Sequence, residues 1–369
     1  MASRTRAYLL GLLSLLMIAY PAGVPAPTAA RAAAVPEGFV WRDGSRLMLG
    51  DQPYVFTGMN IYNAATLSGW CWYPMAHDNV LADSLAAMGP GNEVFRAWFF
   101  QFEATVGGQR DWTAFDRTLA TARASGRKVI AVLVDQWGNC EGSPPGTGYK
   151  TEAWYRSGYR TDPTGPGLPA SYRDWVQEIV TRYRDDPAIL AWQLVNEAED
   201  RTSGGFCTST AGLTLARFAA DIAGLVKSID ANHLLSLGTI GTGQCGARGS
   251  QYRSLHAIDG IDFCEYHDYG HPNEPVPGDE WNGLAVRLAQ CRGLNKPLFT
   301  GELGLLPSEA DGTLPGRATL LQTKLQGQLA AGVVGVLMWA WRDAEHGGSA
   351  LDDYYVGPGD PALTVLGSS

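Results

Sequence analysis

The sequence predicts an α/β protein in which eight parallel strands close into a (β/α)8 (TIM) barrel. Eight short apolar runs alternate with longer segments of helical period along the chain. Most runs are continuously apolar, as strands covered on both faces need to be. The intervals between them are long enough for crossover helices. Because the alternation is uninterrupted, a closed barrel is favoured over an open sheet.

The expected strands begin after a short N-terminal hairpin. Residues 37–55 are predicted to form this hairpin, with turns at Gly44 and Asp51. The eight barrel strands are then predicted, in chain order, at 56–60, 94–100, 129–134, 190–195, 234–238, 261–266, 297–303 and 333–341.

The sequence predicts two of the connecting helices in detail. One face of the first carries apolar residues at helical spacing: Tyr172, Trp175, Val176, Ile179, Val180 and Tyr183. Ser171 with Asp174 predicts its N-cap, and Pro187 its end. The second helix has a shorter stripe: Trp112, Phe115, Leu119 and Ala122. Gly126 is placed to end it.

Residues 1–34 are predicted to be a secretory signal peptide. Arg4 and Arg6 precede an apolar run over 8–20, and small residues end at Ala34. The run is short for a membrane span, although an uncleaved anchor is the alternative. Cleavage after Ala34 is favoured over cleavage after Ala30. Residues 35–369 are then expected to form one domain of a secreted protein.

The charge balance restricts the partners. The formal net charge is −9, and residues 1–34 hold three Arg and no acid, so the remainder is more acidic still. An acidic surface argues against nucleic acid or anionic lipid as partners. A neutral polymer suits it, and a monomer is the default expectation.

Six cysteines in an exported chain favour disulfide bonds. The barrel would place sequential cysteines on neighbouring units, and free buried thiols are the alternative. The expected pairs are Cys71–Cys140, Cys207–Cys245 and Cys264–Cys291. No His or Cys cluster has zinc spacing. We therefore expect neither a metal site nor another cofactor.

Two carboxylates end apolar runs where a barrel carries its chemistry. The fourth run ends in Asn196-Glu197, and the seventh in Gly301-Glu302. The C-terminal ends of barrel strands face one shared pocket. Facing carboxylates with different pKa values are what glycosidic bond cleavage requires. The alternative for Glu197 and for Glu302 is a structural role, because acidic residues at the rim of a barrel also cap helices.

Polar residues near the expected strand ends support a catalytic role for these two carboxylates. Arg96 lies inside the second run, where a charge is costly unless it is paired. It either forms a structural ion pair or keeps a nucleophile ionised and lowers its pKa. His267 and Tyr269 follow the sixth run, and His267 could also be a core residue. Asn196 could donate to a substrate hydroxyl.

Tryptophans form the third part of the prediction. Sugar rings have apolar faces that stack on indole rings. Eight of the 12 Trp fall at expected strand ends or loops, where they could line a cleft: Trp70, Trp72, Trp98, Trp137, Trp154, Trp281, Trp339 and Trp341. Trp112 and Trp175 lie in helix stripes and are expected in the core.

Six motifs occur in order along the chain: Gly58-Met59-Asn60-Ile61-Tyr62, Val94-Phe95-Arg96-Ala97-Trp98, Trp192-Gln193-Leu194-Val195-Asn196-Glu197, Asp262-Phe263 with His267-Asp268-Tyr269, Gly301-Glu302, and Met338-Trp339-Ala340-Trp341. Together they closely resemble glycoside hydrolase family 5. The resemblance implies that Glu197 is the acid/base and Glu302 the nucleophile. It also implies a set of substrate-site residues: Arg96, Asn196, His267, Tyr269 and Trp339, with Trp341 as the alternative to Trp339.

Within that family the chain looks most like the endo-β-1,4-mannanases. Val134-Asp135-Gln136-Trp137-Gly138 and Trp154-Tyr155 resemble segments around their subsites. Three features depart from the family pattern. Ala198 follows Glu197 where Pro is common, Glu265 stands where a small or neutral residue is usual, and the loop 198–210 is idiosyncratic. These departures leave the mechanism intact and the sugar specificity open.

The leading functional hypothesis is therefore a secreted, retaining β-glycoside hydrolase that cleaves β-1,4-linked mannan or glucomannan by double displacement. A cellulase, a mixed-linkage glucanase or an exo-glycosidase would use the same chemistry on another substrate. A carbohydrate-binding protein without catalysis is the hypothesis from another class.

Overall fold

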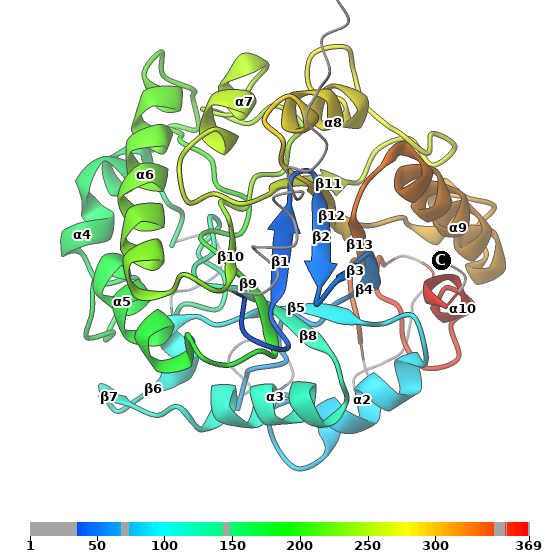
Figure 1. The fold of residues 1–369 in the computed structure, drawn as a ribbon, viewed down its shortest axis with the longest axis horizontal. Helices are drawn as coiled ribbons and strands as arrows, with labels where there is room; N and C mark the ends of the chain where they lie inside the picture. Colours follow the sequence, from blue (N-terminus) through cyan, green and yellow to red (C-terminus); the bar gives the residue numbers. More distant parts are fainter. Residues whose placement is uncertain (1–34, 68–73, 143–147, 343–350, 352, 368–369) are drawn as a thin grey trace, which may run out of the picture.

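The computed structural model describes residues 35–67, 74–142, 148–342, 351 and 353–367. Its central sheet has eight strands: β4 (Phe56–Asn60), β5 (Val94–Trp98), β8 (Lys128–Val132), β9 (Ile189–Gln193), β10 (Leu234–Ser236), β11 (Cys264–Asp268), β12 (Leu298–Leu303) and β13 (Gly335–Met338). Neighbouring strands pair in parallel in the order β10-β9-β8-β5-β4-β13-β12-β11. The predicted barrel is confirmed (Figure 1).

The barrel closes between the two ends of this strand order. The backbone N–H of Asp262 donates to the carbonyl of Leu235 at 2.8 Å, and that of His267 donates to the carbonyl of Ile240 at 2.7 Å. These bonds join β11 and the segment before it to β10 and the segment after it. The carboxyl ends of all eight strands therefore surround one opening.

Helices surround the barrel (Figure 1). The α-helices are α2 (Val80–Met88), α3 (Thr113–Ala124), α4 (Tyr159–Thr161), α5 (Tyr172–Tyr183), α6 (Ala211–Ile229), α7 (Ser250–His256), α8 (Leu284–Arg292), α9 (Leu314–Ala331) and α10 (Leu363–Leu366). Shorter helical segments are the 3-10 helices η1 (Gln101–Ala104) and η3 (Pro307–Glu309) and the π-helix η2 (Trp154–Gly158).

Only the first predicted strand has the observed bounds; the other seven differ by one to three residues at an end, and the differences are largest at the sixth and the eighth. The sixth strand starts at Cys264, because the N–H of Ile261 still bonds to the carbonyl of Ile258 in the turn after α7 and regular pairing with β12 begins only at Cys264. The eighth strand covers only 335–338. The N–H of Val333 still bonds to the carbonyl of Gln328 at the end of α9, so this residue belongs to the helix terminus.

The helix predicted from its apolar stripe is α5. Its stripe is buried, and the N–H of Asp174 donates to the Ser171 hydroxyl at 3.2 Å, as the sequence predicts. In α3 the helix starts one residue after Trp112. The Trp112 ring stacks on Trp175 with ring centroids 5.5 Å apart. Trp175 is fully buried, whereas Trp112 is only partly buried.

The N-terminal hairpin is a three-stranded antiparallel sheet: β1 (Val40–Asp43), β2 (Arg46–Leu49) and β3 (Gln52–Pro53). The short third strand is a correction to the prediction. Val40 and Leu47 of this sheet pack into one apolar cluster with Phe56, Val94 and other residues from the starts of the barrel strands. The sheet therefore covers the N-terminal end of the barrel and leaves the carboxyl end for the site.

A second small sheet pairs β6 (Thr105–Val106) with β7 (Gln109–Arg110).

Two predicted disulfides, Cys207–Cys245 and Cys264–Cys291, are confirmed. Cys71, and with it the predicted pair with Cys140, lies outside the described residues, as does the expected signal peptide. In the described part of the chain, no helix combines the length and apolar character needed to cross a bilayer.

Candidate active site

A cavity of about 430 Å³ lies at the carboxyl ends of the strands, and Glu197, Glu302 and Asn196 are among the residues that line it. Two other hollows, of about 440 and 470 Å³, lie beside α3 and α5 and against the N-terminal sheet. Neither predicted carboxylate lines either of them. The cavity at the strand ends is therefore the candidate site.

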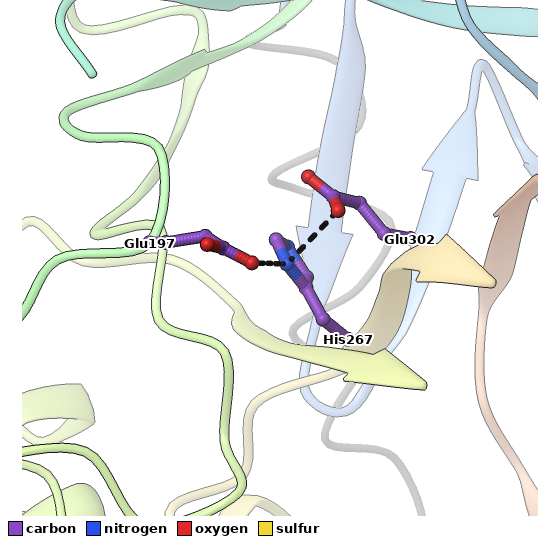
Figure 2. Close-up of side chains that lie close together, drawn as sticks. All are labelled: Glu197, His267 and Glu302. Carbon is purple, nitrogen blue, oxygen red and sulfur yellow. Dashed lines mark hydrogen bonds and ion pairs between the residues drawn. The ribbon is translucent and has the colours of Figure 1, made fainter. Parts of the chain in front are cut away.

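The fold brings the two carboxylates together from β9 and β12. One carboxylate oxygen from each of Glu197 and Glu302, and one ring nitrogen of His267, lie within 4.8 Å of one another. Figure 2 shows the imidazole lying between the two carboxyl groups. Glu197 follows β9, and Glu302 lies within β12, so both side chains start from backbone held in the barrel.

The backbone at Glu197 is in the left-handed region, with φ at 62°, which is unusual for a residue with a side chain. Its neighbours hold it there. The N–H of Asn196 bonds to the carbonyl of Val134, and that of Ala198 to the carbonyl of Gly238, both at 2.8 Å. A Cβ at Gly238 would lie 1.7 Å from the carbonyl oxygen of Val195. Only glycine fits there, and this turn aims Glu197 into the cavity.

His267 contacts carboxylates through both ring nitrogens. Its Nδ1 lies 2.9 Å from Oε1 of Glu197 and 3.5 Å from Oε2 of Glu302, and its Nε2 lies 3.1 Å from Oε1 of Glu265. Burial disfavours the charged ring, but the three carboxylates outweigh burial and raise the pKa of His267 to about 10. The imidazole is therefore a buried cation beside the carboxylate pair.

Arg96 lies behind the cavity wall and is fully buried. Its Nη1 donates to Oε1 of Glu302 at 2.8 Å, and its Nη2 donates to Oδ1 of Asn196 at 2.6 Å. Further bonds go to Asn60 at 2.9 Å and Gln193 at 2.8 Å. The guanidinium thus fixes Glu302 and Asn196 from below.

The two carboxyl groups differ in environment. Burial raises the pKa of Glu302 above its usual value, and His267 and Arg96 only partly oppose this rise. Arg96 therefore acts in the expected direction, but burial outweighs it. Burial also raises the pKa of Glu197, yet bonds from His267 and from Trp137 bring it below its usual value. At this separation the two carboxyls titrate as a pair.

Aromatic side chains form much of the cavity wall. Trp98, Trp137 and Trp339 line it. Trp137 Nε1 donates to Oε2 of Glu197 at 2.6 Å, and Tyr269 donates its hydroxyl to Oε2 of Glu302 at 2.6 Å. Trp339 stacks on Tyr62, with ring centroids 5.6 Å apart and an interplanar angle of 17°.

Of the other loop tryptophans, those that the structure describes do not line the cavity. Trp341 is buried in the core, so Trp339 and not Trp341 faces the cavity. Trp154 contacts the rings of Tyr172 and Phe218 between α5 and α6. Trp281 is 66% exposed. Trp70 and Trp72 lie outside the described residues.

Five lining residues were not selected from the sequence: Tyr62, Asp135, Asn139, Tyr354 and Tyr355. Tyr62 and Asp135 do lie in quoted motifs, so a signal existed for them. Asp135 accepts from Nδ2 of Asn196 at 2.8 Å, and burial raises its pKa to about 6. Tyr354 and Tyr355 come from the segment after the last strand, which carries no local pattern.

Glu197, His267 and Glu302 also form the one group of His, Cys, Asp or Glu among the described residues that is compact enough to hold a metal ion. Both nitrogens of His267 already face carboxylates. A ring in this position serves as a cation and has no lone pair to offer a metal. The arrangement therefore fits acid–base and nucleophilic chemistry better than metal binding.

Comparisons with known proteins point to one family. A family model described as GH family 5 beta-mannosidase-like matches residues 171–283. The chain is 29% identical over 311 residues to mannan endo-1,4-beta-mannosidase 1 of Oryza sativa subsp. japonica, covering 72% of this chain and 68% of that protein. It is 27% identical over 321 residues to probable mannan endo-1,4-beta-mannosidase C of Aspergillus terreus, covering 75% of each.

Solved structures share the fold. The endo-1,4-beta-mannanase from Rhizomucor miehei superposes with a TM-score of 0.62 at 18% identity, covering 89% of this chain and 97% of that one. The endo-beta-1,4-mannanase from Thermotoga petrophila gives a TM-score of 0.60 at 19% identity, covering 85% and 75%.

Proposed function

We propose that this chain is a secreted, retaining glycoside hydrolase that cleaves β-1,4-linked mannan or glucomannan, because it resembles the endo-β-1,4-mannanases of family 5. The observation that carries the mechanism is the approach of Glu197 and Glu302, whose carboxylate oxygens lie within 4.8 Å. Retaining enzymes place their two carboxyl groups roughly 5–5.5 Å apart, whereas inverting enzymes need roughly 6.5–9.5 Å to admit a water molecule.

In the first step, Glu302 attacks the anomeric carbon and forms a glycosyl ester, while Glu197 protonates the leaving oxygen. In the second step, Glu197 takes a proton from water, which attacks the same carbon and releases Glu302. Arg96 and Tyr269 hold the attacking carboxylate by two donated bonds. Both bonds favour the ionised form that the first step needs.

The first step also needs a proton on Glu197, although in the free protein the pKa of Glu197 is lowered and that of Glu302 is raised. Because the two carboxyls share one buried site, we expect them to hold a single proton between them. The reactive form is the one with that proton on Glu197. In this form Arg96 and Tyr269 stabilise the charge on Glu302.

The cavity wall supports a sugar as the ligand. Trp98, Trp137 and Trp339 offer indole surface for the apolar faces of pyranose rings, and Asn196 offers a fixed amide. Arg96 and Asp135 hold both ends of that amide, so its orientation is set before substrate binds. His267 is not among the residues that line the cavity, and it contacts the Glu197 and Glu302 carboxylates from behind them. No cofactor takes part in this scheme.

A substrate panel with stereochemical analysis tests the proposal. Mannan, glucomannan, carboxymethylcellulose and aryl glycosides are compared side by side, and the anomer first released is identified by NMR. We expect the fastest turnover on mannan or glucomannan, with the β-anomer released first. Release of the α-anomer would exclude retention, and preference for carboxymethylcellulose would make the enzyme a glucanase.

Variants of the two carboxylates test their roles. We expect Glu302→Ala and Glu197→Ala to lose about 10³-fold or more in kcat. Azide should restore turnover of an activated aryl glycoside in Glu197→Ala, with a β-glycosyl azide as the product, because a small anion needs no general base. Full activity in Glu302→Ala would end the nucleophile assignment.

We further propose that the protein is exported after removal of residues 1–34 and acts outside the cell as a single-domain monomer. The N-terminal sequence of the secreted protein tests the cleavage site, which we expect before Val35. Light scattering on the mature protein tests the oligomeric state.

A further inference from the structure

Glu265 is a buried carboxylate that the proposed mechanism does not use. It lies on β11, two residues before His267. Its side chain is fully buried and is not among the residues that line the cavity. It therefore cannot touch a substrate. A buried charge of this kind is costly unless its partners stabilise it.

Its partners come from four strands, its own β11 included. Oε1 lies 3.1 Å from Nε2 of His267, and Oε2 accepts from the Ser236 hydroxyl at 2.9 Å and from Nε2 of Gln193. Nε of Arg96 lies 3.9 Å away. Glu265 thus has a cation on each side of it and is placed under the candidate active site.

The bond to Glu265 decides which hydrogen atoms the His267 ring carries. A neutral imidazole has one N–H and one lone pair, so one nitrogen would turn a lone pair toward a carboxylate. The ring faces Glu265 through Nε2 and Glu197 through Nδ1. With both facing carboxyl groups ionised, both contacts are favourable only when both nitrogens carry hydrogen, and this is the imidazolium.

We infer that Glu265 is a positioning residue, which holds His267 as an imidazolium with its Nδ1–H directed at the Glu197 and Glu302 carboxylates. The inference deepens the proposed function, on which its meaning for catalysis rests. A cation held between two carboxylates lets them lie close together in a buried site. It also lowers the pKa of both carboxyls.

The packing on β12 fits this arrangement. A Cβ built on Gly301 would lie 2.1 Å from Oε1 of Glu265 and 3.0 Å from Nε2 of His267. Any side chain at position 301 would therefore displace the Glu265–His267 pair. The glycine before Glu302 provides the space that the pair occupies.

Charged groups face His267 from several strands. Glu197 faces the ring from the end of β9, Glu302 from β12, and Glu265 from its own strand. Arg96 from β5 is bound to Glu302 and is the second cation of the cluster. The Tyr269 hydroxyl is bound to Glu302. Glu265 is the carboxylate of this set that lies away from the cavity, and its shorter contact with a cation is the one to the His267 ring.

The direct test is the protonation state of His267, measured by NMR on protein labelled with ¹⁵N-histidine. The His267 signals are identified by their loss in His267→Asn. In the wild type we expect both ring nitrogens to stay protonated up to pH 8. In Glu265→Gln we expect the ring to titrate at least one pH unit lower than in the wild type. A neutral His267 at pH 7 in the wild type would overturn the inference without any variant.

Ser236→Ala is the matched control. It removes one of the bonds to Glu265, and so loosens the junction between β10 and β11, but it leaves the charge of Glu265 in place. We expect it to leave the His267 titration unchanged. If Ser236→Ala shifts that titration as much as Glu265→Gln does, the role of Glu265 is structural and the inference is wrong.

Activity gives a second readout. When His267 loses its charge, the pKa values of both nearby carboxyls rise. We therefore expect the pH profile of kcat/KM to move upward by about half a unit or more in Glu265→Gln, and to stay in place in Ser236→Ala. An unmoved profile in Glu265→Gln would contradict the inference. The NMR experiment needs no turnover, so it decides the inference even if the proposed hydrolysis fails.

Discussion

Trp137 makes a single polar contact that has a measurable consequence. Its indole N–H donates to Glu197 at 2.6 Å and lowers the pKa of that carboxyl. Trp137→Phe keeps an aromatic ring in the wall but removes the donor. One hydrogen bond of about 1 kcal/mol corresponds to a rise of roughly 0.7 pKa units. Because the proposed acid must hold a proton, we expect the alkaline limb of kcat/KM to move up by about this amount.

Trp339→Phe is the control for this prediction. Trp339 lines the same cavity, and its ring stacks on Tyr62. We expect this variant to raise KM through weaker stacking and to leave the alkaline limb where it is. A shift of the limb in Trp339→Phe but not in Trp137→Phe would contradict the assignment of the donor.

At this same scale, the residues that the sequence predicted best are those with a strand to place them. Glu197, Glu302 and His267 follow or end apolar runs, and a barrel brings the ends of its strands together. Tyr354 and Tyr355 reach the cavity from the chain after the last strand, where no periodicity marks them. Trp341 shares its motif with Trp339 but is buried in the core, although a regular extended segment would point both side chains to the same side, so the motif alone does not tell the two apart.

At the scale of elements, the start of α5 is a helix cap that the sequence identified. Ser171 accepts from the N–H of Asp174. We expect Ser171→Ala to lower the free energy of unfolding by about 1 kcal/mol, because an N–H of the first helical turn loses its partner. Urea denaturation measures the change.

Thr210 provides the matched case, since it stands at the N-cap of α6 and its side chain makes no capping hydrogen bond. Thr210→Ala is expected to change the stability by less than about 0.5 kcal/mol. Equal losses in the two variants would mean that the Ser171 cap contributes nothing specific.

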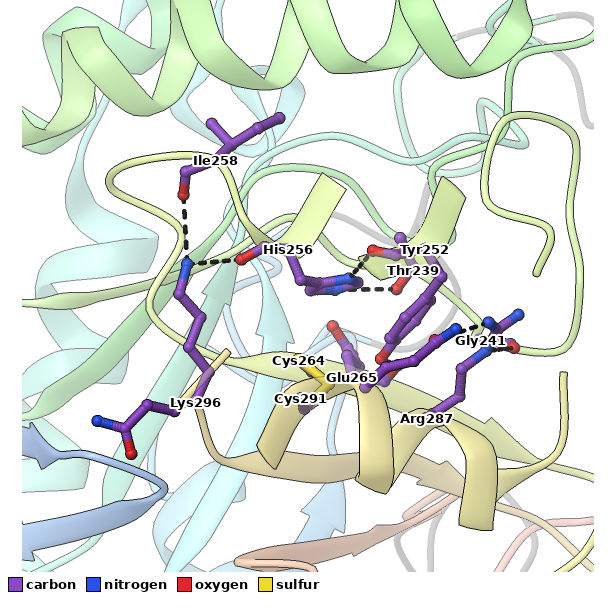
Figure 3. The surroundings of a disulfide bond; sticks show 12 residues. Thr239, Gly241, Tyr252, His256, Ile258, Cys264, Glu265, Arg287, Cys291 and Lys296 are labelled. Carbon is purple, nitrogen blue, oxygen red and sulfur yellow. Dashed lines mark hydrogen bonds between the residues drawn. A yellow bond between two sulfur atoms is a disulfide. The ribbon is translucent and has the colours of Figure 1, made fainter. Parts of the chain in front are cut away.

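The two described disulfides allow stability and activity to be separated. They close segments of similar length, 38 and 27 residues. Each is expected to stabilise the fold by about 3–4 kcal/mol. Cys207–Cys245 joins the loop after Glu197 to the loop after β10, where the N–H of Asp200 also bonds to the carbonyl of Cys245 at 3.0 Å. Cys264–Cys291 joins the start of β11 to α8 (Figure 3), and neither of these cysteines lines the cavity.

We therefore expect both double Cys→Ser variants to lose stability by similar amounts. Only the variant without Cys207–Cys245 should also lose activity at a temperature where both remain folded, because its loop carries the turn that aims Glu197. Denaturation curves and kcat/KM, measured on the same preparations, test this. Equal activity losses would show that the position of the disulfide is irrelevant.

At the scale of the whole molecule, stability depends on pH through buried groups such as His256. Its ring lies between α7 and the barrel, with Nδ1 2.8 Å from the carbonyl of Tyr252 (Figure 3). Burial lowers the pKa of His256 to about 4, and the carbonyl of Tyr252 only partly opposes this. Between about pH 6.5 and pH 4, His256 is therefore protonated in the unfolded chain but neutral in the folded chain. Stability is lost as the pH falls from 6.5 to 4.

His256→Gln removes this proton uptake but keeps a side-chain donor for the Tyr252 carbonyl. We expect the wild type to lose about 3 kcal/mol more than the variant between pH 6.5 and pH 4. Denaturation at several pH values measures the difference. The exposed His271→Gln is the control and should run parallel to the wild type. Parallel curves for His256→Gln would mean that His256 is already protonated in the fold.

The amino-acid sequence by itself determined the number and order of the barrel strands, the family resemblance and the two carboxylates. Each of these can be recognised from short stretches of sequence, because a strand buried on both faces is a continuous apolar run and a reactive residue directly follows or ends such a run. Tertiary structure alone decided that a cation lies between the carboxylates, that Glu265 supports it, and that burial outweighs Arg96 at Glu302. Each of these depends on distances between strands far apart in the chain, and electrostatic energies in a buried site are set by those distances.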